Sequence, residues 1–296
     1  MLLERFRKGK QAEVEALRLL ADAGNMPAPL EGQRPDFLAA LRGESGAAVN
    51  IQGQPLAVVA EYKRASPSRG VICESLEVED VARQYAVSGA DCLSILTEEA
   101  HFRGCLGYLA RAADPGLYES ARPPLLRKDF IFDTLQVAAT AATPASALLL
   151  IVRLTPDAMV LRLLREQAES HGMHAVVEVF DQEDLLLARE SGARIIQVNA
   201  RDLETLVTDR EAALALARAC PPQKGEVWIA ASGIDRGEHL RAVAQAGFNA
   251  ALVGSALMQW GQPGQALAEL LAQAVSTGSG EHKKSETAGE GGGHAH

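Results

Sequence analysis

Glu61 and Lys63 stand two residues apart at the end of an apolar run, in the stretch AEYKRASPSRG. In an extended chain this spacing places both side chains on one face, so a carboxylate and an ammonium group can point into the same space. Lys128 and Glu178 stand at the ends of two further apolar runs. Acid and base catalysis near neutral pH uses groups that shift one another's pKa values. We therefore predict that these four residues are catalytic, provided that the fold brings them together.

Small polar residues follow the last two apolar runs, in ASGID and LVGSALM. Backbone N–H groups in such turns can hold a phosphate dianion, although a single Gly-Ser pair also serves plain loop geometry. Two such turns in succession, with a hydroxyl from the SPSRG turn, are stronger evidence. They predict a phosphate site formed by Ser66, Ser232, Gly233, Gly254 and Ser255.

These side chains can meet only if the runs that carry them are strands of one sheet. From Leu56 onward, eight short apolar runs alternate with helical patterns: LAVVAE, CLSIL, PLLRKD, ALLLIV, HAVVEV, RIIQVN, EVWIAA and AALVG. Continuous apolar runs are typical of parallel strands covered by helices. Eight such pairs predict an α/β fold, the (β/α)8 TIM barrel, whose chemistry lies where the carboxyl ends of the strands converge. An open doubly wound sheet is the alternative, but no GxGxxG motif follows the first run.

Taken singly, a Glu or Lys at a strand end is more typical of a solvated rim residue than of a catalyst, and only convergence changes that interpretation. Residues 1–275 are predicted to form one barrel domain, with a helical extension over residues 1–48 ahead of the first strand. Residues 276–296 are polar and glycine-rich, which predicts a disordered tail.

The composition excludes several classes of function. The net charge is −9 and there is no basic tract, which argues against nucleic acid or an anionic membrane as a partner. No apolar run reaches the length of a membrane span, and the charged amino terminus does not resemble a signal peptide. The four cysteines lack the spacing of zinc sites, so we expect free thiols in a reducing cytoplasm: Cys73, Cys92, Cys105 and Cys220.

Five stretches strongly resemble the indole-3-glycerol phosphate synthase family of tryptophan biosynthesis. They are AEYKRASPSRGVI, CLSILTEEAHFRG, LLRKDFIFDTLQV, VVEVFDQEDLLLARESGARIIQVNARDLETL and ASGIDRGEHLRAVAQAGFNAALVGSALM. They cover most of residues 56–258 in the family's order. The resemblance implies that 1-(2-carboxyphenylamino)-1-deoxyribulose 5-phosphate closes its ring and loses CO2 and water. It implies no cofactor and no metal.

The implied reaction suggests a role for each charged residue. The ring carbon that bears the carboxylate must attack a ketone, whose oxygen needs a proton donor, and we predict Lys128 for this task. Lys63 and Arg201 would place positive charge near the carboxylate that leaves as CO2, and Lys63 is also a candidate acid for the dehydration. Glu61 and Glu178 are the candidate bases, and which of them takes which proton stays open.

The family pattern also implies substrate contacts. Asn199 would bind a substrate hydroxyl, and Phe102 and Phe130 would border the aromatic ring, although packing in the core is an equally open interpretation for both rings. Arg201 can alternatively pair with Asp202 or cap a helix. We expect a phosphorylated small molecule as the partner of the chain, which would be a monomer or a weak homo-oligomer.

Three positions depart from the family pattern. Ala231 stands where the family usually has a glutamate, Gln197 stands where it has a glycine, and Arg103 replaces a smaller polar residue. The loss of a carboxylate at Ala231 keeps a second hypothesis open, a phosphate-binding barrel that does not catalyse. A related sugar-phosphate isomerase is a third hypothesis, but those barrels use an acid and base pair of Asp or Cys type.

Overall fold

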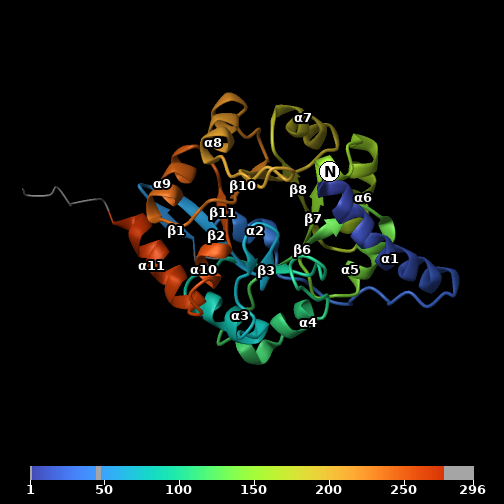
Figure 1. Cartoon of the computed structure of the whole chain (residues 1–296). Coiled ribbons are helices and arrows are strands. Elements are labelled where there is room, and N and C mark those ends of the chain that lie inside the picture. The colour runs from blue at the N-terminus through green and yellow to red at the C-terminus, as the bar shows by residue number, and fades with distance from the viewer. Residues whose placement is uncertain (1, 45–47, 277–296) are drawn as a thin grey trace, which may run out of the picture.

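The computed structural model describes residues 2–44 and 48–276, and its centre is a closed ring of parallel strands seen end-on in Figure 1. The strands follow one another around the ring in chain order, and the first pairs with the second and the last to close it. They are β2 (Gln54–Tyr62), β5 (Cys92–Leu96), β6 (Leu125–Ile131), β7 (Ala147–Ile151), β8 (His174–Val179), β9 (Ile195–Asn199), β10 (Val227–Ala231) and β11 (Ala250–Val253). Each predicted run overlaps one of these strands, so the predicted TIM barrel is confirmed.

Helices surround the ring and connect successive strands (Figure 1). They are α3 (Val78–Val87), α4 (Tyr108–Ala112), α5 (Thr134–Ala141), α6 (Ala158–Ser170), α7 (Gln182–Glu190), α8 (Arg210–Ala219), α9 (Gly237–Gln245) and α11 (Pro263–Val275), with the short α10 (Ser255–Met258) directly after β11. Four of these surrounding helices begin after an aspartate whose carboxylate accepts hydrogen bonds from N–H groups of the first turn: Asp133, Asp157, Asp181 and Asp209. Such caps satisfy backbone donors that a helix start leaves free.

The strands are buried on both faces, which explains their continuous apolar runs. In β2, Ala57 and Val59 point into the barrel, whereas Val58 and Ala60 pack under the surrounding helices. The same alternation continues around the ring and gives an inner and an outer core. At the carboxyl end of β2 the next inward position is Glu61, so the lining of the barrel changes from apolar to charged at that end.

The helical extension reaches both ends of the barrel. The helix α1 (Leu2–Asp22) packs against α5 and β6, and α2 (Phe37–Leu41) inserts Phe37 and Leu41 into the inner core. Between them, the Arg34 guanidinium donates to carbonyl oxygens of the last residue of α5 and of the turn that follows it. The predicted helical extension is therefore present.

Two short hairpins escaped the sequence analysis. The strand β1 (Val49–Ile51) pairs antiparallel with β2, across a turn in which Gln52 and Gly53 both have positive φ. After β2, β3 (Ala65–Ser66) pairs with β4 (Gly70–Val71) inside the serine-rich loop. Segments of two or three residues are too short to show the alternation that predicts a strand.

Several expectations concern the chain as a whole. The predicted tail lies outside the described residues except for Ser276, and the domain division stays a prediction. All four cysteines are free thiols. Among the described residues, no helix is long and apolar enough to cross a membrane.

Close packing of α9 on α11 leads to a test of stability. A Cβ atom on Gly237 would lie 2.3 Å from the carbonyl carbon of Gln273 and 2.5 Å from the nitrogen of Ala274. Gly237→Ala is therefore expected to lower the free energy of unfolding by about 1–3 kcal/mol, because backbone atoms cannot move aside cheaply. Urea unfolding measures the difference.

Gly9 offers the matched control, because it lies inside α1 and a Cβ atom there would meet nothing closer than 4.0 Å. Gly9→Ala is expected to leave stability unchanged or to raise it by up to about 1 kcal/mol, the gain in helix propensity. Equal unfolding midpoints for the two variants would contradict the interpretation of the α9–α11 contact.

Candidate active site

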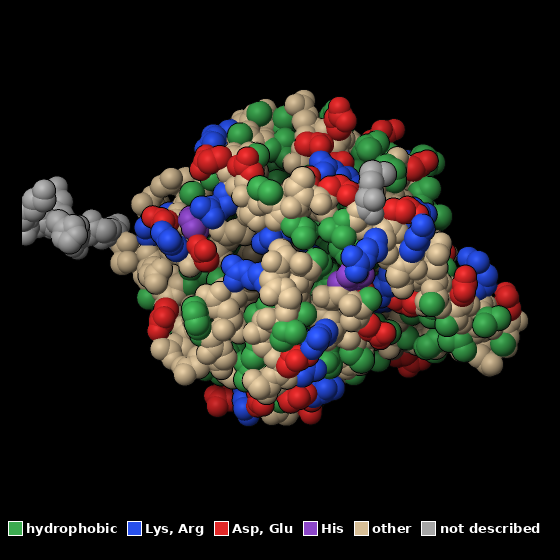
Figure 2. Space-filling view, in the orientation of Figure 1, with side chains coloured by type: hydrophobic (Ala, Val, Ile, Leu, Met, Phe, Trp, Pro, Cys, Tyr) green, Lys and Arg blue, Asp and Glu red, His purple; other side chains and the backbone are tan. Residues whose placement is uncertain are grey.

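A pocket of about 1160 Å³, counted out to its open mouth, lies at the carboxyl ends of the barrel strands. Figure 2 shows lysine and arginine side chains beside a hollow in the middle of this face. We call it the mouth pocket. Every residue predicted from the sequence as catalytic or substrate-binding lines it: Glu61, Lys63, Ser66, Phe102, Lys128, Phe130, Glu178, Asn199, Arg201, Ser232, Gly233, Gly254 and Ser255.

Glu61 and Lys63 form a partly buried ion pair at the end of β2. The Lys63 Nζ lies 2.7 Å from Glu61 Oε1, and the Ser94 hydroxyl donates to Glu61 Oε2 at 3.4 Å. Burial by itself raises the pKa of Glu61, but the ammonium groups of Lys63 and Lys128 outweigh it, and the pKa lies below its ordinary value. Glu61 is therefore a carboxylate at neutral pH, and its negative charge is stabilised by the ammonium groups of both lysines.

Lys128 and Glu178 face one another across the pocket. The Lys128 Nζ lies 3.9 Å from Glu178 Oε2, and the Glu178 side chain is 1% exposed. The Gln197 Nε2 donates a hydrogen bond to the same carboxylate, while its Oε1 has no partner in residues 2–44 and 48–276. The amide that departs from the family pattern thus contacts a predicted base directly.

One end of the mouth pocket suits an anion. Ser232 and Gly233 have φ values of 72° and 76°, a left-handed pair that turns the chain sharply after β10. Arg69 and Arg201 line the same pocket, and burial together with the charge of Arg69 lowers the pKa of Arg201. Two cations that repel one another are stabilised by a bound anion. The predicted phosphate turns therefore share this pocket with two arginines.

The alternative interpretation of Arg201 does not match its contacts. Its guanidinium donates to the Leu206 carbonyl oxygen, and its backbone N–H donates to the Asn199 side chain. The Asp202 carboxylate instead faces Arg153, at 3.5 Å. Arg201 therefore lies at the pocket without a salt bridge to its neighbour in sequence.

Aromatic rings form another part of the pocket wall. Phe130 stacks on Phe6 with 4.2 Å between ring centroids and lies 6.2 Å from Phe102. Phe6 comes from α1, more than one hundred residues away in the chain. Phe130 belongs to the inner core and lines the pocket as well, so the packing role and the ligand role are compatible.

Phe6, Arg69 and Glu98 are among the residues of the pocket lining that the sequence analysis did not name. The buried Glu98 carboxylate accepts hydrogen bonds from the N–H groups of Ala100, His101 and Phe102, and so fixes the loop that carries Phe102. A signal existed only for Arg69, which belongs to the same turn as Ser66. The other two depend on contacts that no local pattern displays.

The closed ring of parallel strands and the acid and base groups at its mouth define a (β/α)8-barrel enzyme. The family model described as indole-3-glycerol phosphate synthase matches residues 3–270, and the chain belongs to this family.

Curated relatives carry the same description. The protein from Albidiferax ferrireducens is 38% identical over 92% of this chain and 99% of its own, and that from Roseiflexus sp. is 39% identical over 87% and 93%. A solved 3-hexulose-6-phosphate synthase superposes with a TM-score of 0.58 over 74% of this chain and 99% of its own. At 18% identity this likeness shows the fold alone.

Gly254 provides a test of the pocket floor. A Cβ atom there would lie 2.4 Å from Glu61 Oε1, so the carboxylate rests against the glycine backbone. Gly254→Ala is expected to displace Glu61 and to lower kcat/KM by at least about tenfold. Gly107→Ala is the control, since its Cβ would meet only the Cys105 Sγ at 3.5 Å. A kcat/KM for Gly254→Ala within about twofold of the control would contradict this geometry.

The lowered pKa of Glu61 predicts a dependence of stability on pH. Pairing with Lys63 stabilises the fold above the ordinary pKa near 4.5, and this stability is lost as the pH falls through the lower folded pKa. Lys63→Met is therefore expected to cost about 1–3 kcal/mol at pH 7 and markedly less in the acid range. Urea unfolding across the pH range measures the difference, and Lys8→Met, at an exposed lysine, is the control. A cost independent of pH would contradict the pairing.

Proposed function

We propose that the chain catalyses the ring closure of 1-(2-carboxyphenylamino)-1-deoxyribulose 5-phosphate to indole-3-glycerol phosphate. Membership of the family supports the proposal. The observation that carries it is the pair Lys128 and Glu178, 3.9 Å apart, in one pocket with the ion pair of Glu61 and Lys63. Acid, base and positive charge are then within reach of one small molecule.

Lys128 is the proposed acid of the ring closure. The ring carbon that bears the carboxylate forms a bond to the ketone carbon, and Lys128 donates a proton to the ketone oxygen, which becomes a hydroxyl. The Lys128 side chain is 18% exposed, so its ammonium group lies partly shielded from water. A positioned acid contributes about 10²- to 10⁴-fold in rate.

Positive charge serves the second step, in which the bond between the ring carbon and the carboxylate breaks. Lys63 and Arg201 hold the carboxylate until CO2 leaves, and the electron pair restores the aromatic ring. The new hydroxyl then leaves as water with a proton from Lys63, while a base removes a proton from the carbon next to the nitrogen. Glu61 and Glu178 are the proposed bases.

The remaining contacts orient the substrate. Ser66, Ser232, Gly233, Gly254 and Ser255 hold the phosphate, and Asn199 binds a hydroxyl. Phe102 and Phe130 border the ring. At the end of β10, Ala231 places a methyl group in the pocket lining, and Glu61 and Glu178 stay the proposed bases.

We also propose that the chain works without a cofactor in the cytoplasm, as a monomer or a weak homo-oligomer. The four free thiols support a reducing compartment. Size-exclusion chromatography with light scattering tests the assembly.

Lys128→Ala tests the function. Removing the acid is expected to lower kcat/KM by about 10²- to 10⁴-fold, measured by the rise of indole fluorescence as product forms. Lys224→Ala, at an exposed lysine outside the pocket, is the matched control and is expected to keep full activity.

Three outcomes are distinguishable. Undiminished turnover by Lys128→Ala would remove Lys128 as the acid. A wild-type chain that binds indole-3-glycerol phosphate in calorimetry but turns over no substrate would instead favour a phosphate-binding barrel without catalysis. Failure to bind and to turn over would reject both.

A further inference from the structure

Gln197 and Glu178 are neighbours across the strands β9 and β8. Their Cα atoms are partners in the parallel register, and neighbouring strands lie about 4.8 Å apart. Val176 and Ile195, two residues earlier on each strand, belong to the inner core, so Glu178 and Gln197 also point into the barrel. The Gln197 Nε2 donates a hydrogen bond to Glu178 Oε2. The amide and the carboxylate therefore share one layer of the barrel interior.

Gln197 lies beneath the mouth pocket rather than in its wall. It is 0% exposed and is not part of the pocket lining, whereas Asn199, two residues further along β9, lines the pocket. A substrate in the pocket can therefore meet Glu178 and Asn199 but not the amide of Gln197. An effect of Gln197 on the reaction has to pass through a side chain that the substrate contacts.

Half of the hydrogen-bonding capacity of this amide is unused. The Gln197 Oε1 is buried and has no partner in the part of the chain that the structure describes. Its register partner on β10, Ile229, belongs to the inner core, and its side chain carries no donor. A buried acceptor without a donor costs free energy, which an apolar side chain of the same size avoids. Packing alone would favour an apolar residue here, so the hydrogen bond to Glu178 is the feature that glutamine adds.

The two oxygens of the Glu178 carboxylate have different surroundings. The Gln197 Nε2 donates to Oε2, and the Lys128 Nζ lies 3.9 Å from the same atom. Within residues 2–44 and 48–276, Oε1 accepts no hydrogen bond, although the side chain is only 1% exposed. Since Glu178 lines the pocket, Oε1 is the oxygen left for a hydrogen of the substrate.

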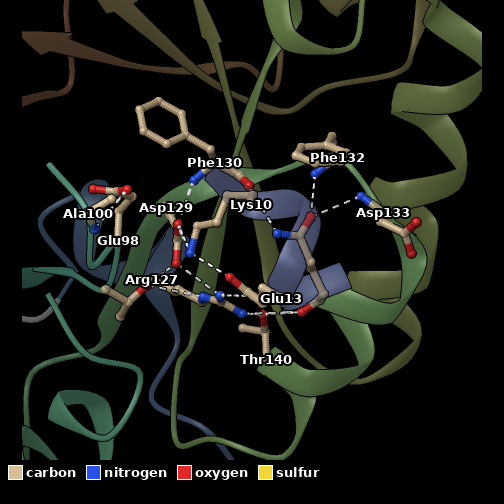
Figure 3. A network of polar contacts seen from close by, with 12 residues as sticks. Lys10, Glu13, Glu98, Ala100, Arg127, Asp129, Phe130, Phe132, Asp133 and Thr140 are labelled. Atoms are coloured by element: carbon tan, nitrogen blue, oxygen red, sulfur yellow. Dashed lines mark hydrogen bonds and ion pairs between the residues drawn. The ribbon is translucent and has the colours of Figure 1, made fainter. Parts of the chain in front are cut away.

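Asp129 of β6 shows how a buried carboxylate is held when both of its oxygens have partners (Figure 3). The Lys10 Nζ lies 2.8 Å from its Oδ1, and the Arg127 Nη2 lies 2.9 Å from its Oδ2. The Phe130 backbone N–H also donates to Oδ1, and the Thr97 hydroxyl donates to Oδ2. Each oxygen thus has two partners, as a buried charge requires. The proposed base, with one oxygen held and the other free, is arranged to meet a ligand.

We propose that Gln197 is a positioning residue of the active site, whose amide anchors Oε2 of Glu178 and so directs Oε1 toward the substrate. The inference rests on the proposed role of Glu178 as a base. The family pattern has a glycine at this position, which has no side chain to donate, so the anchor is a feature of this chain. A reacting group displaced by about 1 Å can lose about 10²-fold in rate, so kcat is the quantity that the anchor protects.

Gln197→Met in the full chain removes the donor and keeps the length of the side chain. We expect kcat to fall by about 10- to 100-fold, while KM and the dissociation constant of indole-3-glycerol phosphate change by less than about threefold. Gln197→Asn keeps the amide but is one methylene shorter, so its donor falls short of Glu178 and a similar loss of kcat is expected. Should Gln197→Met not fold, Gln197→Asn replaces it.

Gln167 of α6 offers the matched control. It is a partly buried glutamine whose Nε2 donates to the Thr134 carbonyl oxygen and whose Oε1 also has no partner among the described residues. It lies outside the pocket lining. Gln167→Met is expected to keep the kcat and KM of the wild type. An equal loss of kcat in Gln167→Met and Gln197→Met would reject the anchor, because a general disturbance of the fold would then explain both.

A double-mutant cycle separates positioning from general support. If Gln197 acts through Glu178, then Gln197→Met lowers kcat in the wild-type background but has no further effect in the Glu178→Ala background. A merely structural loss would lower kcat by the same factor in both backgrounds, and that result would reject the inference.

A crystal structure of Gln197→Met gives a readout that does not need turnover. The Glu178 Oε2 is expected to move by about 1 Å or more from its place 3.9 Å from the Lys128 Nζ, because no amide would hold it. An inactive wild-type chain rejects the proposed function alone, and the crystal structure still tests the anchor. The inference is overturned if Glu178 keeps its place in that crystal structure, or if an active chain loses less than about twofold in kcat on Gln197→Met.

Discussion

Pairing of β2 with β5 turns a sheet into a ring, and the active-site geometry depends on that closure. In an open sheet the first and last strands would lie far apart, whereas in the ring the carboxyl ends of all strands border one mouth. Closure places Glu61 of β2 in the same pocket as Lys128 of β6 and Glu178 of β8. The apolar inner core below them keeps the strands at fixed spacing, so the charged groups lie on a rigid support.

Charge at the mouth is balanced locally rather than by the chain as a whole. The chain carries a net charge of −9, which would repel an anionic substrate at long range. At the pocket, Lys63 and Lys128 face Glu61 and Glu178, and Arg69 and Arg201 belong to the same lining as the turn of Ser232 and Gly233. An anion thus meets cations only once it enters the pocket, where partial burial strengthens each interaction.

The helical extension contributes to the site by contacts that cross the fold. Phe6 adds a ring to the pocket wall, and the Lys10 ammonium group pairs with the Asp129 carboxylate of β6. Gln197 adds another support by its hydrogen bond to Glu178. Position at the carboxyl end of a strand does not identify these residues, because they contact neighbours of the predicted catalytic groups or hold one of those groups in place. The site is therefore larger than the set of residues at the strand ends.

The sequence by itself determined the barrel, because eight continuous apolar runs followed by helices leave few other ways to bury them. It also indicated that Glu61, Lys128 and Glu178 line the mouth pocket, since the side chains at the carboxyl ends of barrel strands converge on one mouth. Only the tertiary structure decided the rest. In the sequence, nothing distinguishes Lys10 from other lysines of an amphipathic helix. In the structure, its Nζ lies 2.8 Å from Asp129 Oδ1, a residue more than one hundred positions later in the chain. The register shift between β6 and β7, from Arg127 to Ile131, and the place of Phe6 are likewise absent from the local pattern, because long-range packing and ion pairing depend on distances that local periodicity does not contain.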